Sequence, residues 1–333
     1  MIRFVRSAGI ALAALATTSF IGWSGPAYAL EHVKISYVVP TVQYGSLLVG
    51  LDKGFFKDEG IDVELVQAGG GVATPALISG DLQFSGSPSV AISADLKGAH
   101  LKAIFVGSDH SAFQLWVQPD IKTFEDLKGK QVGIISRGDT TEISLRYILA
   151  KKNLPADYLS YTPLGTGTGR VAALISGTFP GALIDAGEVK DMRDSGHLTK
   201  LHLLIDMSKE VHMTFGGFAT SDAMIKEHRD TVRHVVRGLM KGLAVVRSSR
   251  EDTIASLVKH GSTPTAAAED YSVNAPILSP TSVVSDADQA FELKLRAEML
   301  GVDEKKIPPP HYFFDFSFVK EAAAELKKEN WKP

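Results

Sequence analysis

The chain repeats part of its own sequence. The letters ALISG occur at residues 76–80 and again at 173–177, each time at the end of an expected helix that a glycine closes. A short apolar run follows both copies, and the expected strands and helices around them come in the same order. Because a repeated order of elements indicates repeated structural units, the sequence predicts two similar α/β lobes.

Strands and helices alternate through the first repeat. Apolar and β-branched runs predict strands, and apolar residues at helical spacing predict helices. The expected strands are 33–39, 61–66, 82–85 and 101–107, and the expected helices are 43–53, 73–79 and 88–97. This alternation favours βαβ units and a mostly parallel sheet.

The alternation then starts again. The second repeat predicts strands at 131–135, 158–162 and 181–185 and helices at 140–151 and 170–176. Beyond about residue 215 the pattern is mainly helical, which predicts a helical C-terminal extension. Its expected helices are 222–228, 231–248, 251–259, 265–274, 287–300 and 318–328.

The N-terminal residues have the pattern of a secretory signal. Two arginines precede an apolar stretch at 10–23, and the small-residue triplet AYA follows at 27–29. This order is typical of a signal peptide that is cleaved after Ala29. We therefore expect residues 1–29 to be removed and the mature protein to be periplasmic. The chain has no cysteine, so we do not expect a lipoprotein.

Composition excludes several classes of function. The chain has 333 residues, a length typical of about two domains. Hydrophobic residues make up 44% of it, which is enough to form a core. With 35 Lys and Arg against 38 Asp and Glu, the net charge is −3, which disfavours nucleic-acid binding. The absence of cysteine excludes disulfides, thiolate metal sites and cysteine nucleophiles.

The candidate ligand-binding residues lie in turns that follow strands. In open parallel sheets, ligands bind beyond the carboxyl ends of the strands, where helix N-termini offer unpaired N–H groups. Three such turns lie in the first repeat, with the sequences PTVQY at 40–44, GGGV at 69–72 and GSPS at 86–89. The candidates there are Thr41, Gln43, Tyr44, Gly71, Ser87, Pro88 and Ser89.

The second repeat has matching turns. They are SRGDTTE at 136–142, GTGTG at 165–169 and DAGE at 185–188, and their candidates are Arg137, Thr140, Thr141, Thr166 and Asp185. Asp139 and Glu142 have the spacing of a capping pair. Asp185 and Glu188 would repel an anion, so capping or a hinge salt bridge suits them better.

Catalytic motifs are missing from the sequence. The GTGTG segment lacks the dinucleotide-binding spacing, because Arg170 stands where the third glycine is needed. The phosphate-binding loop, the GxSxG nucleophile elbow and the HExxH zinc motif do not occur. We therefore expect a protein that is not an enzyme and that uses no cofactor and no metal.

Several segments together resemble a known family. GFFKDEG at 54–60 leads into IDVEL at 61–65, and ALISGDLQF at 76–84 and DLKGKQVG at 126–133 follow in order. Across the mature chain this order resembles the nitrate/sulfonate/taurine-type substrate-binding proteins of ABC importers. The resemblance implies a type II periplasmic-binding fold, in which two α/β lobes joined by two crossover segments hold a ligand between them for delivery to a membrane permease.

The resemblance also implies where the lobes divide. Lobe 1 would comprise residues 30–118 and 215–333, and lobe 2 residues 119–214. The crossovers would be residues 113–117 and 215–219, and Phe215 would face the ligand. Related pyrimidine-synthesising enzymes of this fold need a cysteine-rich motif, so their activity is not expected in this cysteine-free chain.

These observations predict a receptor for a small organic anion, a sulfonate or a carboxylate. The Ser and Thr candidates would hold its acid group, while Gln43, Tyr44 and Phe215 would contact the rest. The charged turn around Arg137 differs from the Gly-Ser/Thr turn of relatives that bind simple anions, which disfavours nitrate. Two alternatives stay open: a binding protein for a neutral heterocycle, such as a thiamine-precursor pyrimidine or a flavin, and an exported enzyme or sensor-partner domain. We expect a monomer.

Overall fold

The computed structural model describes Met1 and residues 30–165 and 167–333. The expected signal segment therefore lies, except for Met1, outside the described residues, and so does the candidate Thr166. Among the described residues, no helix is both long enough and apolar enough to cross a bilayer.

Lobe 2 is built on a five-stranded sheet with the strand order β6-β5-β7-β4-β8. Its strands are β4 (Gln114–Val117), β5 (Gln131–Ile134), β6 (Ser160–Pro163), β7 (Gly181–Ile184) and β8 (His202–Asp206). Strand β5 pairs in parallel with β6 and β7, as βαβ units require, whereas β4 pairs antiparallel with β7 and β8. The helices of this lobe are α5 (Thr140–Lys151), α6 (Gly167–Ile175) and α7 (Ala186–Asp194).

Lobe 1 contains two pairs of strands. Strand β1 (Glu31–Tyr37) runs parallel to β2 (Ile61–Gln67), and β3 (Leu101–His110) runs antiparallel to β9 (His212–Ser221). The strand expected at 82–85 forms only isolated bridges, which connect Phe84 to Ile35 and Ser85 to Ala219. These bridges link the two pairs of strands into one layer.

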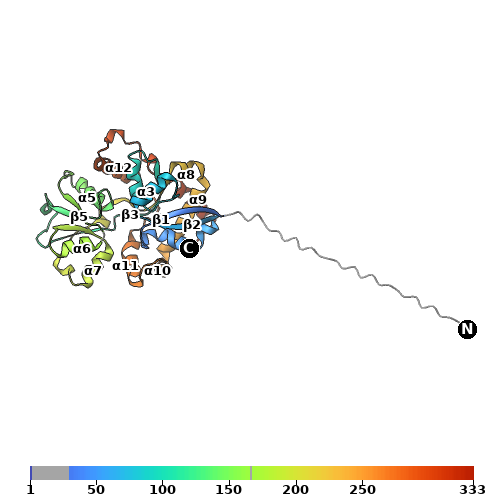
Figure 1. Ribbon diagram of the computed structural model, residues 1–333, viewed down its shortest axis with the longest axis horizontal. Helices are drawn as coiled ribbons and strands as arrows, with labels where there is room; N and C mark the ends of the chain where they lie inside the picture. Colours follow the sequence, from blue (N-terminus) through green and yellow to red (C-terminus); the bar gives the residue numbers. More distant parts are fainter. Residues whose placement is uncertain (2–29, 166) are drawn as a thin grey trace.

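The helices of lobe 1 come from both ends of the chain (Figure 1). The N-terminal ones are α1 (Gly45–Asp52), α2 (Phe55–Asp58), α3 (Gly70–Ser79) and α4 (Pro88–Asp95). The C-terminal ones are α8 (Asp222–Glu227), α9 (Arg229–Ser248), α10 (Arg250–Lys259), α11 (Pro264–Asn274), α12 (Asp286–Leu300) and α13 (Ser317–Lys328). The expected C-terminal helices are confirmed to within two residues at each end.

The repeated ALISG segments have the same role in the two lobes. Gly80 follows α3 with a φ of 84°, and Gly177 follows α6 with a φ of 73°. Residues with a side chain rarely adopt this left-handed conformation, so glycine ends both helices there. The repeat in the sequence thus corresponds to the same helix ending, once in each lobe.

Two helices from distant parts of the sequence form the centre of lobe 1. Helix α1 packs against α9 at glycine positions, where a Cβ on Gly242 would lie 2.0 Å from the carbonyl oxygen of Ser46. A Cβ on Gly238 would likewise lie 2.6 Å from the ring of Phe56 on α2. Because these positions hold small residues, the helices can approach closely. Together the helices enclose the main apolar cluster of lobe 1.

The boundary between the lobes differs from the expected one. Strand β4 belongs to the sheet of lobe 2, although the sequence predicts that lobe 1 extends to residue 118. The chain passes from β3 to β4 between His110 and Gln114, and it returns from β8 to β9 between Asp206 and His212. Pairing partners decide this boundary, and a four-residue strand carries no local signal of its partners.

Candidate functional site

The first and third turns of lobe 1 are in direct contact. The hydroxyl of Tyr44 donates a hydrogen bond to the carbonyl oxygen of Gly86 at 3.1 Å. A Cβ on Gly86 would lie 2.8 Å from the Tyr44 ring and 2.5 Å from the carbonyl oxygen of Ser36. The Tyr44 side chain is buried, and burial raises the pKa of its hydroxyl above the usual range. Tyr44 therefore braces the site rather than offering its hydroxyl to a ligand.

The N-termini of α3 and α4 lie next to each other. A Cβ on Gly70 would lie 2.6 Å from Val90 and 3.1 Å from Ser87, so glycine permits the close approach of the two helix starts. Gly71, one residue further, is exposed. Ser87 precedes α4 and Pro88 is its first residue, as the sequence predicts.

Ser89 contacts a buried arginine. The hydroxyl of Ser89 accepts a hydrogen bond from Arg296 at 2.6 Å, and its carbonyl oxygen accepts a second one at 2.8 Å. The sequence predicts a ligand contact at this position, but the structure uses the side chain to fix α4 to α12. No local pattern could have revealed a partner 207 residues away.

In lobe 2, a carboxylate of the chain itself occupies the N-terminus of α5. Asp139 accepts hydrogen bonds from the N–H groups of Thr141 and Glu142 at 3.0 and 3.2 Å. The Thr141 hydroxyl donates to the same carboxylate at 2.5 Å and accepts from the N–H of Ile135 at 3.0 Å. Burial raises the pKa of Asp139, although these hydrogen bonds oppose the rise. The expected capping role is present, and it leaves Thr141 fully engaged, whereas Thr140 is half-buried.

Arg137 stands beside the start of α5. One guanidinium nitrogen donates to the carbonyl oxygen of Tyr161 at 2.7 Å, and another lies 3.4 Å from Glu142. The guanidinium carbon lies 5.5 Å from the centre of the Tyr161 ring. Because 57% of the side chain is nevertheless exposed, Arg137 is held in place while its outer face stays accessible.

Arg170 ties two of the candidate turns of lobe 2 together, at 165–169 and 185–188. This buried guanidinium donates to the carbonyl oxygens of Gly165 and Leu183 and forms an ion pair with Glu188. Asp185 and Glu188 cap each other's backbone N–H groups, each at 2.9 Å. Burial and the charge of Asp185 raise the pKa of Glu188 to about 7, against the opposing effect of Arg170. The sequence shows Arg170 only as a departure from a glycine motif, so its structural role was missed.

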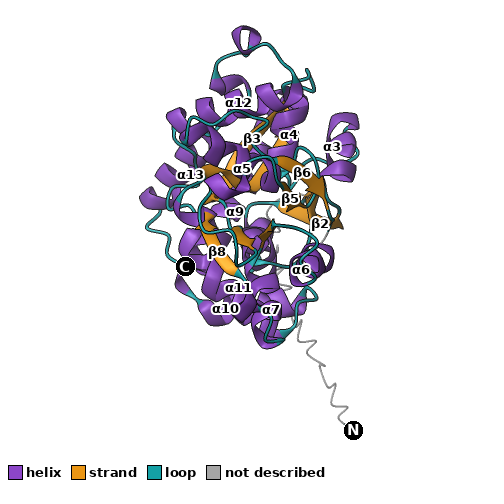
Figure 2. Cartoon of the chain, turned by 90° about the vertical axis from the view of Figure 1, so that its left-hand side faces the viewer, coloured by secondary structure: helices purple, strands orange, loops and turns teal. Residues whose placement is uncertain are grey.

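Helix α7 of lobe 2 contacts helix α11 of lobe 1, and the two helices are neighbours in both views (Figure 1, Figure 2). Arg193 on α7 lies 3.6 Å from Glu269 on α11. The neighbouring Asp270 accepts a hydrogen bond from the N–H of Val42 at 2.6 Å, which ties α11 to the first turn of lobe 1. Burial raises the pKa of Asp270, and the negative charge of nearby Asp185 in lobe 2 adds to the rise. A single acidic residue in the middle of a helix belongs to no recognisable sequence motif. The sequence therefore did not indicate Asp270 as a ligand-binding candidate.

The remaining candidates lie where the chain crosses between the lobes. Gly216 on β9 approaches Gln43, since a Cβ at Gly216 would lie 3.5 Å from the Gln43 side chain. The ring of Phe215 packs edge-on against Phe113, with ring centres 5.6 Å apart. Thr41 closes the first turn by accepting the Tyr44 N–H at 2.9 Å. The structure thus places Gln43 beside β9 and Phe215 against Phe113, which lies where the chain passes from lobe 1 to lobe 2.

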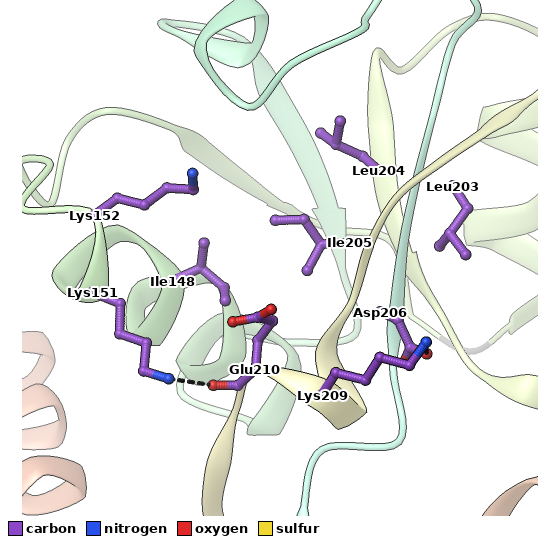
Figure 3. Close-up of a pocket in the computed structure, with 9 residues that line it drawn as sticks. All are labelled: Ile148, Lys151, Lys152, Leu203, Leu204, Ile205, Asp206, Lys209 and Glu210. Carbon is purple, nitrogen blue, oxygen red and sulfur yellow. Dashed lines mark hydrogen bonds and ion pairs between the residues drawn. The ribbon is translucent and has the colours of Figure 1, made fainter.

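A separate hollow lies on lobe 2 (Figure 3). It has a volume of about 620 Å³ and lies between the C-terminal end of α5 and the edge strand β8, with Ile148 and Ile205 on its apolar side and Lys151, Lys152 and Lys209 around it. Its lining contains none of the described ligand candidates. Within the described part of the chain, no three His, Asp or Glu residues gather to hold a metal ion.

Comparisons with known proteins identify a family model and solved structures that match this chain. A family model described as "NMT1/THI5 like" matches residues 41–252. A solved protein of Bordetella bronchiseptica RB50 superposes with a TM-score of 0.69 and 22% identity, covering 89% of this chain and 98% of that one. The periplasmic aliphatic sulphonate-binding protein SsuA of Escherichia coli superposes with a TM-score of 0.67 and 19% identity, covering 84% and 92%.

An enzyme has the same fold. The desulfurization enzyme DszB superposes with a TM-score of 0.59 and 11% identity, covering 89% of this chain and 99% of that one. No curated protein sequence matches the chain. At these identities the structural likeness shows the fold alone, and it confirms the expected periplasmic-binding-protein architecture.

Proposed function

Because the chain belongs to the NMT1/THI5-like family, we propose that it is the solute-binding component of an ABC importer. It works as a monomer in the periplasm after its signal segment is removed, and it passes a small molecule to a membrane permease. The fold that it shares with a periplasmic sulphonate-binding protein supports this role. So does the lack, in the sequence, of the catalytic motifs named above.

One observation carries the proposal: Asp270 binds the N–H of Val42 in the first turn of lobe 1 and lies near Asp185 in a turn of lobe 2, and beside it an ion pair between Arg193 and Glu269 joins the lobes. A solute held by both lobes favours the closed arrangement of the lobes. A solute held by only one lobe leaves the equilibrium between the open and closed arrangements unchanged. The proposed contacts are Thr41, Gln43, Gly71, Ser87 and Pro88 from lobe 1, Arg137, Thr140, Thr166 and Asp185 from lobe 2, and Phe215 between them.

The acid group of the solute is proposed to face lobe 1. The adjacent starts of α3 and α4 supply backbone N–H groups. Each helix terminus contributes about 0.3–1 kcal/mol to anion binding, up to ~2 when partly buried. Micromolar affinity needs about 8.2 kcal/mol, so Arg137, direct hydrogen bonds and the exclusion of water supply the rest.

The rest of the solute is proposed to carry N–H donors. The amides of Thr141 and Glu142 at the start of α5 already bind Asp139. Asp185 and Asp270 add negative charge near α7 and α11. Carboxylates on this side would repel a plain anion but attract an ammonium or amine group. An organic acid with an amine, such as an aminosulfonate, fits the proposed contacts of both lobes.

A neutral heterocycle is the second candidate solute. The same carboxylates favour it, because Asp185 can accept hydrogen bonds from ring N–H or amino groups while Phe215 offers an aromatic edge. In this case Arg137 contributes little to affinity. Replacing Arg137 with Ala therefore separates the two candidates.

Native mass spectrometry of the purified mature protein tests capture directly. We expect a small molecule to co-purify, to leave when the protein is unfolded, and to keep its mass during incubation with the protein. A changed mass would support the enzyme alternative instead.

Calorimetry with taurine, ethanesulfonate and an aminopyrimidine then tests the solute class. We expect taurine to bind more tightly than ethanesulfonate, and Arg137→Ala to weaken it strongly. Binding of the aminopyrimidine alone, unaffected by that change, would favour the heterocycle.

A further inference from the structure

Helix α12 contacts both lobes, although the chain crosses between them elsewhere. On one side, Leu293 packs in an apolar cluster of lobe 1 with Ile92 of α4 and Phe313. On the other side, Leu295 belongs to the main apolar cluster of lobe 2. The ring of Phe291 meets Tyr147 of α5 edge-on, with ring centres 4.8 Å apart. The helix therefore bridges the lobes without a covalent connection, beside α5 in Figure 1.

The polar side chains of α12 fix it to the candidate site and to a crossover strand. Arg296 donates to the hydroxyl and the carbonyl oxygen of Ser89 at the start of α4. Glu292 accepts the N–H of Thr214 on β9 at 2.9 Å and pairs with Arg296 at 2.5 Å. Both charged side chains are fully buried.

These polar contacts hold α12 against α4 and β9. Moving α12 away from them would break the hydrogen bonds that Arg296 donates to Ser89 and that Glu292 accepts from Thr214, and buried charged groups that lose their hydrogen-bond partners are unfavourable. The apolar contacts of α12 with lobe 2 involve no such penalty. When the lobes separate, α12 therefore stays with α4 and β9, and its contacts with α5 are the ones that yield.

We propose that α12 is a strap between the lobes: it restrains their separation through Phe291 and Leu295, and through Arg296 it links that separation to the start of α4. The second part rests on the proposed function, because it matters only if α4 holds a solute. Phe291 and Leu295 are positioning residues, since neither lies in the turns that hold the proposed solute contacts.

The chain offers a matched pair of variants for the test. Leu293 and Leu295 are the same residue type on the same helix and are 2% and 3% exposed, so Leu293→Ala and Leu295→Ala remove the same atoms from opposite sides. Spin labels can be placed on Lys57→Cys in lobe 1 and Asp157→Cys in lobe 2, both exposed, because the chain has no cysteine of its own. Double electron–electron resonance then measures the distance between the lobes without any solute.

We expect Leu295→Ala to lengthen and broaden the interlobe distance distribution, and Leu293→Ala to leave it like that of the parent protein. If the two variants give the same distribution, whether changed or unchanged, the strap is ruled out. Phe291→Ala, at a half-buried position, provides a milder second variant should Leu295→Ala not fold. It should broaden the distribution in the same direction, and an unchanged distribution would overturn the proposal.

Hydrogen exchange tests the link to α4. We expect Phe291→Ala to speed amide exchange in residues 88–95, although Phe291 packs against α5, while the exposed Lys294→Ala on the same helix leaves it unchanged. Unchanged exchange in Phe291→Ala would remove this part of the proposal. Failure to find any solute would contradict the proposed function but would not change the measured distance between the lobes. The proposed function and the strap can therefore be tested separately.

Discussion

Arg193 of lobe 2 lies 3.6 Å from Glu269 of lobe 1, and this ion pair joins α7 to α11 at the edge where the two lobes meet. The arginine side chain is 59% exposed and the glutamate 24%, so water screens much of the attraction. Next to it, Asp270 holds the first turn of lobe 1 through the Val42 N–H. The contact between α7 and α11 therefore connects the position of lobe 2 to a turn that we propose contacts the solute.

Reversing the charge of Arg193 should shift the lobes toward the open arrangement. An exposed pair contributes about 0.2–1 kcal/mol, and Arg193→Glu replaces this attraction with a repulsion of similar size, so it should change the ratio of open to closed molecules by up to about thirtyfold. Small-angle scattering should show a larger radius of gyration. The double variant Arg193→Glu/Glu269→Arg should restore the original radius, and a radius that stays large in the double variant would contradict the pairing.

Two glycines of lobe 1 should respond differently to alanine. Gly86→Ala places a methyl group 2.5 Å from the Ser36 carbonyl oxygen, and overpacking of this kind costs about 1–3 kcal/mol of stability. Gly71→Ala meets no described atom within 4 Å, so it should keep or slightly raise stability while weakening solute binding. Urea unfolding and calorimetry measure the two effects. Unchanged affinity in Gly71→Ala would remove Gly71 from the site.

Loss of the Arg170 guanidinium should destabilise lobe 2. Arg170→Met leaves Glu188, which is 11% exposed, without its cation, and breaking a buried pair in this way costs about 3–5 kcal/mol. Because the neutral Gln is easier to bury, Arg170→Met/Glu188→Gln should be more stable than Arg170→Met alone. Urea midpoints compare them. Equal midpoints for the single and the double variant would show that the lost charge partner is not the cause.

Acid should lower the stability of the folded protein, in part because the Glu59 carboxylate becomes protonated. Burial by itself raises the pKa of this carboxyl, but hydrogen bonds from Arg237 and Lys241 outweigh burial and hold the pKa below its usual 4.5. The unfolded chain therefore binds a proton more readily than the folded one, and this stabilisation is present above about pH 4.5 and is lost as the pH falls.

Substitution of Glu59 should reveal that contribution. Glu59→Gln should lose less stability than the parent protein between neutral pH and pH 4, as measured by urea unfolding at several pH values. The exposed Glu227→Gln at the end of α8 provides the matched control and should behave like the parent protein. A parent-like pH profile for Glu59→Gln would mean that another group governs the acid response.

The sequence predicted most elements because their signals are local. The C-terminal helices have regular apolar spacing, and the glycine-closed ALISG repeats end α3 and α6 as expected. The segment at 82–85 was expected to be a strand but forms only two bridges, because its length is too short to determine its own pairing. The lobe boundary was misplaced for the same reason, since β4 joins the sheet of lobe 2 only through its partners β7 and β8.

The candidate site was predictable only at the level of turns. The turns around Tyr44, Gly70 and Gly86 do come together in lobe 1. Which of their side chains are available depends on distant residues: Arg296 engages Ser89, and Asp139 engages Thr141. Asp270 and Arg170 were missed because a single acid in a helix, or a single arginine after glycines, has no distinctive spacing.

By itself, the sequence determined that this chain forms two α/β lobes, since residue spacing, caps and glycine positions act over a few residues. The tertiary structure alone decided that Asp270 lies near Asp185, that Arg296 engages Ser89 and that α12 contacts both lobes. Those outcomes depend on burial and on contacts between residues more than 200 positions apart, and burial and distance are properties of the packed molecule.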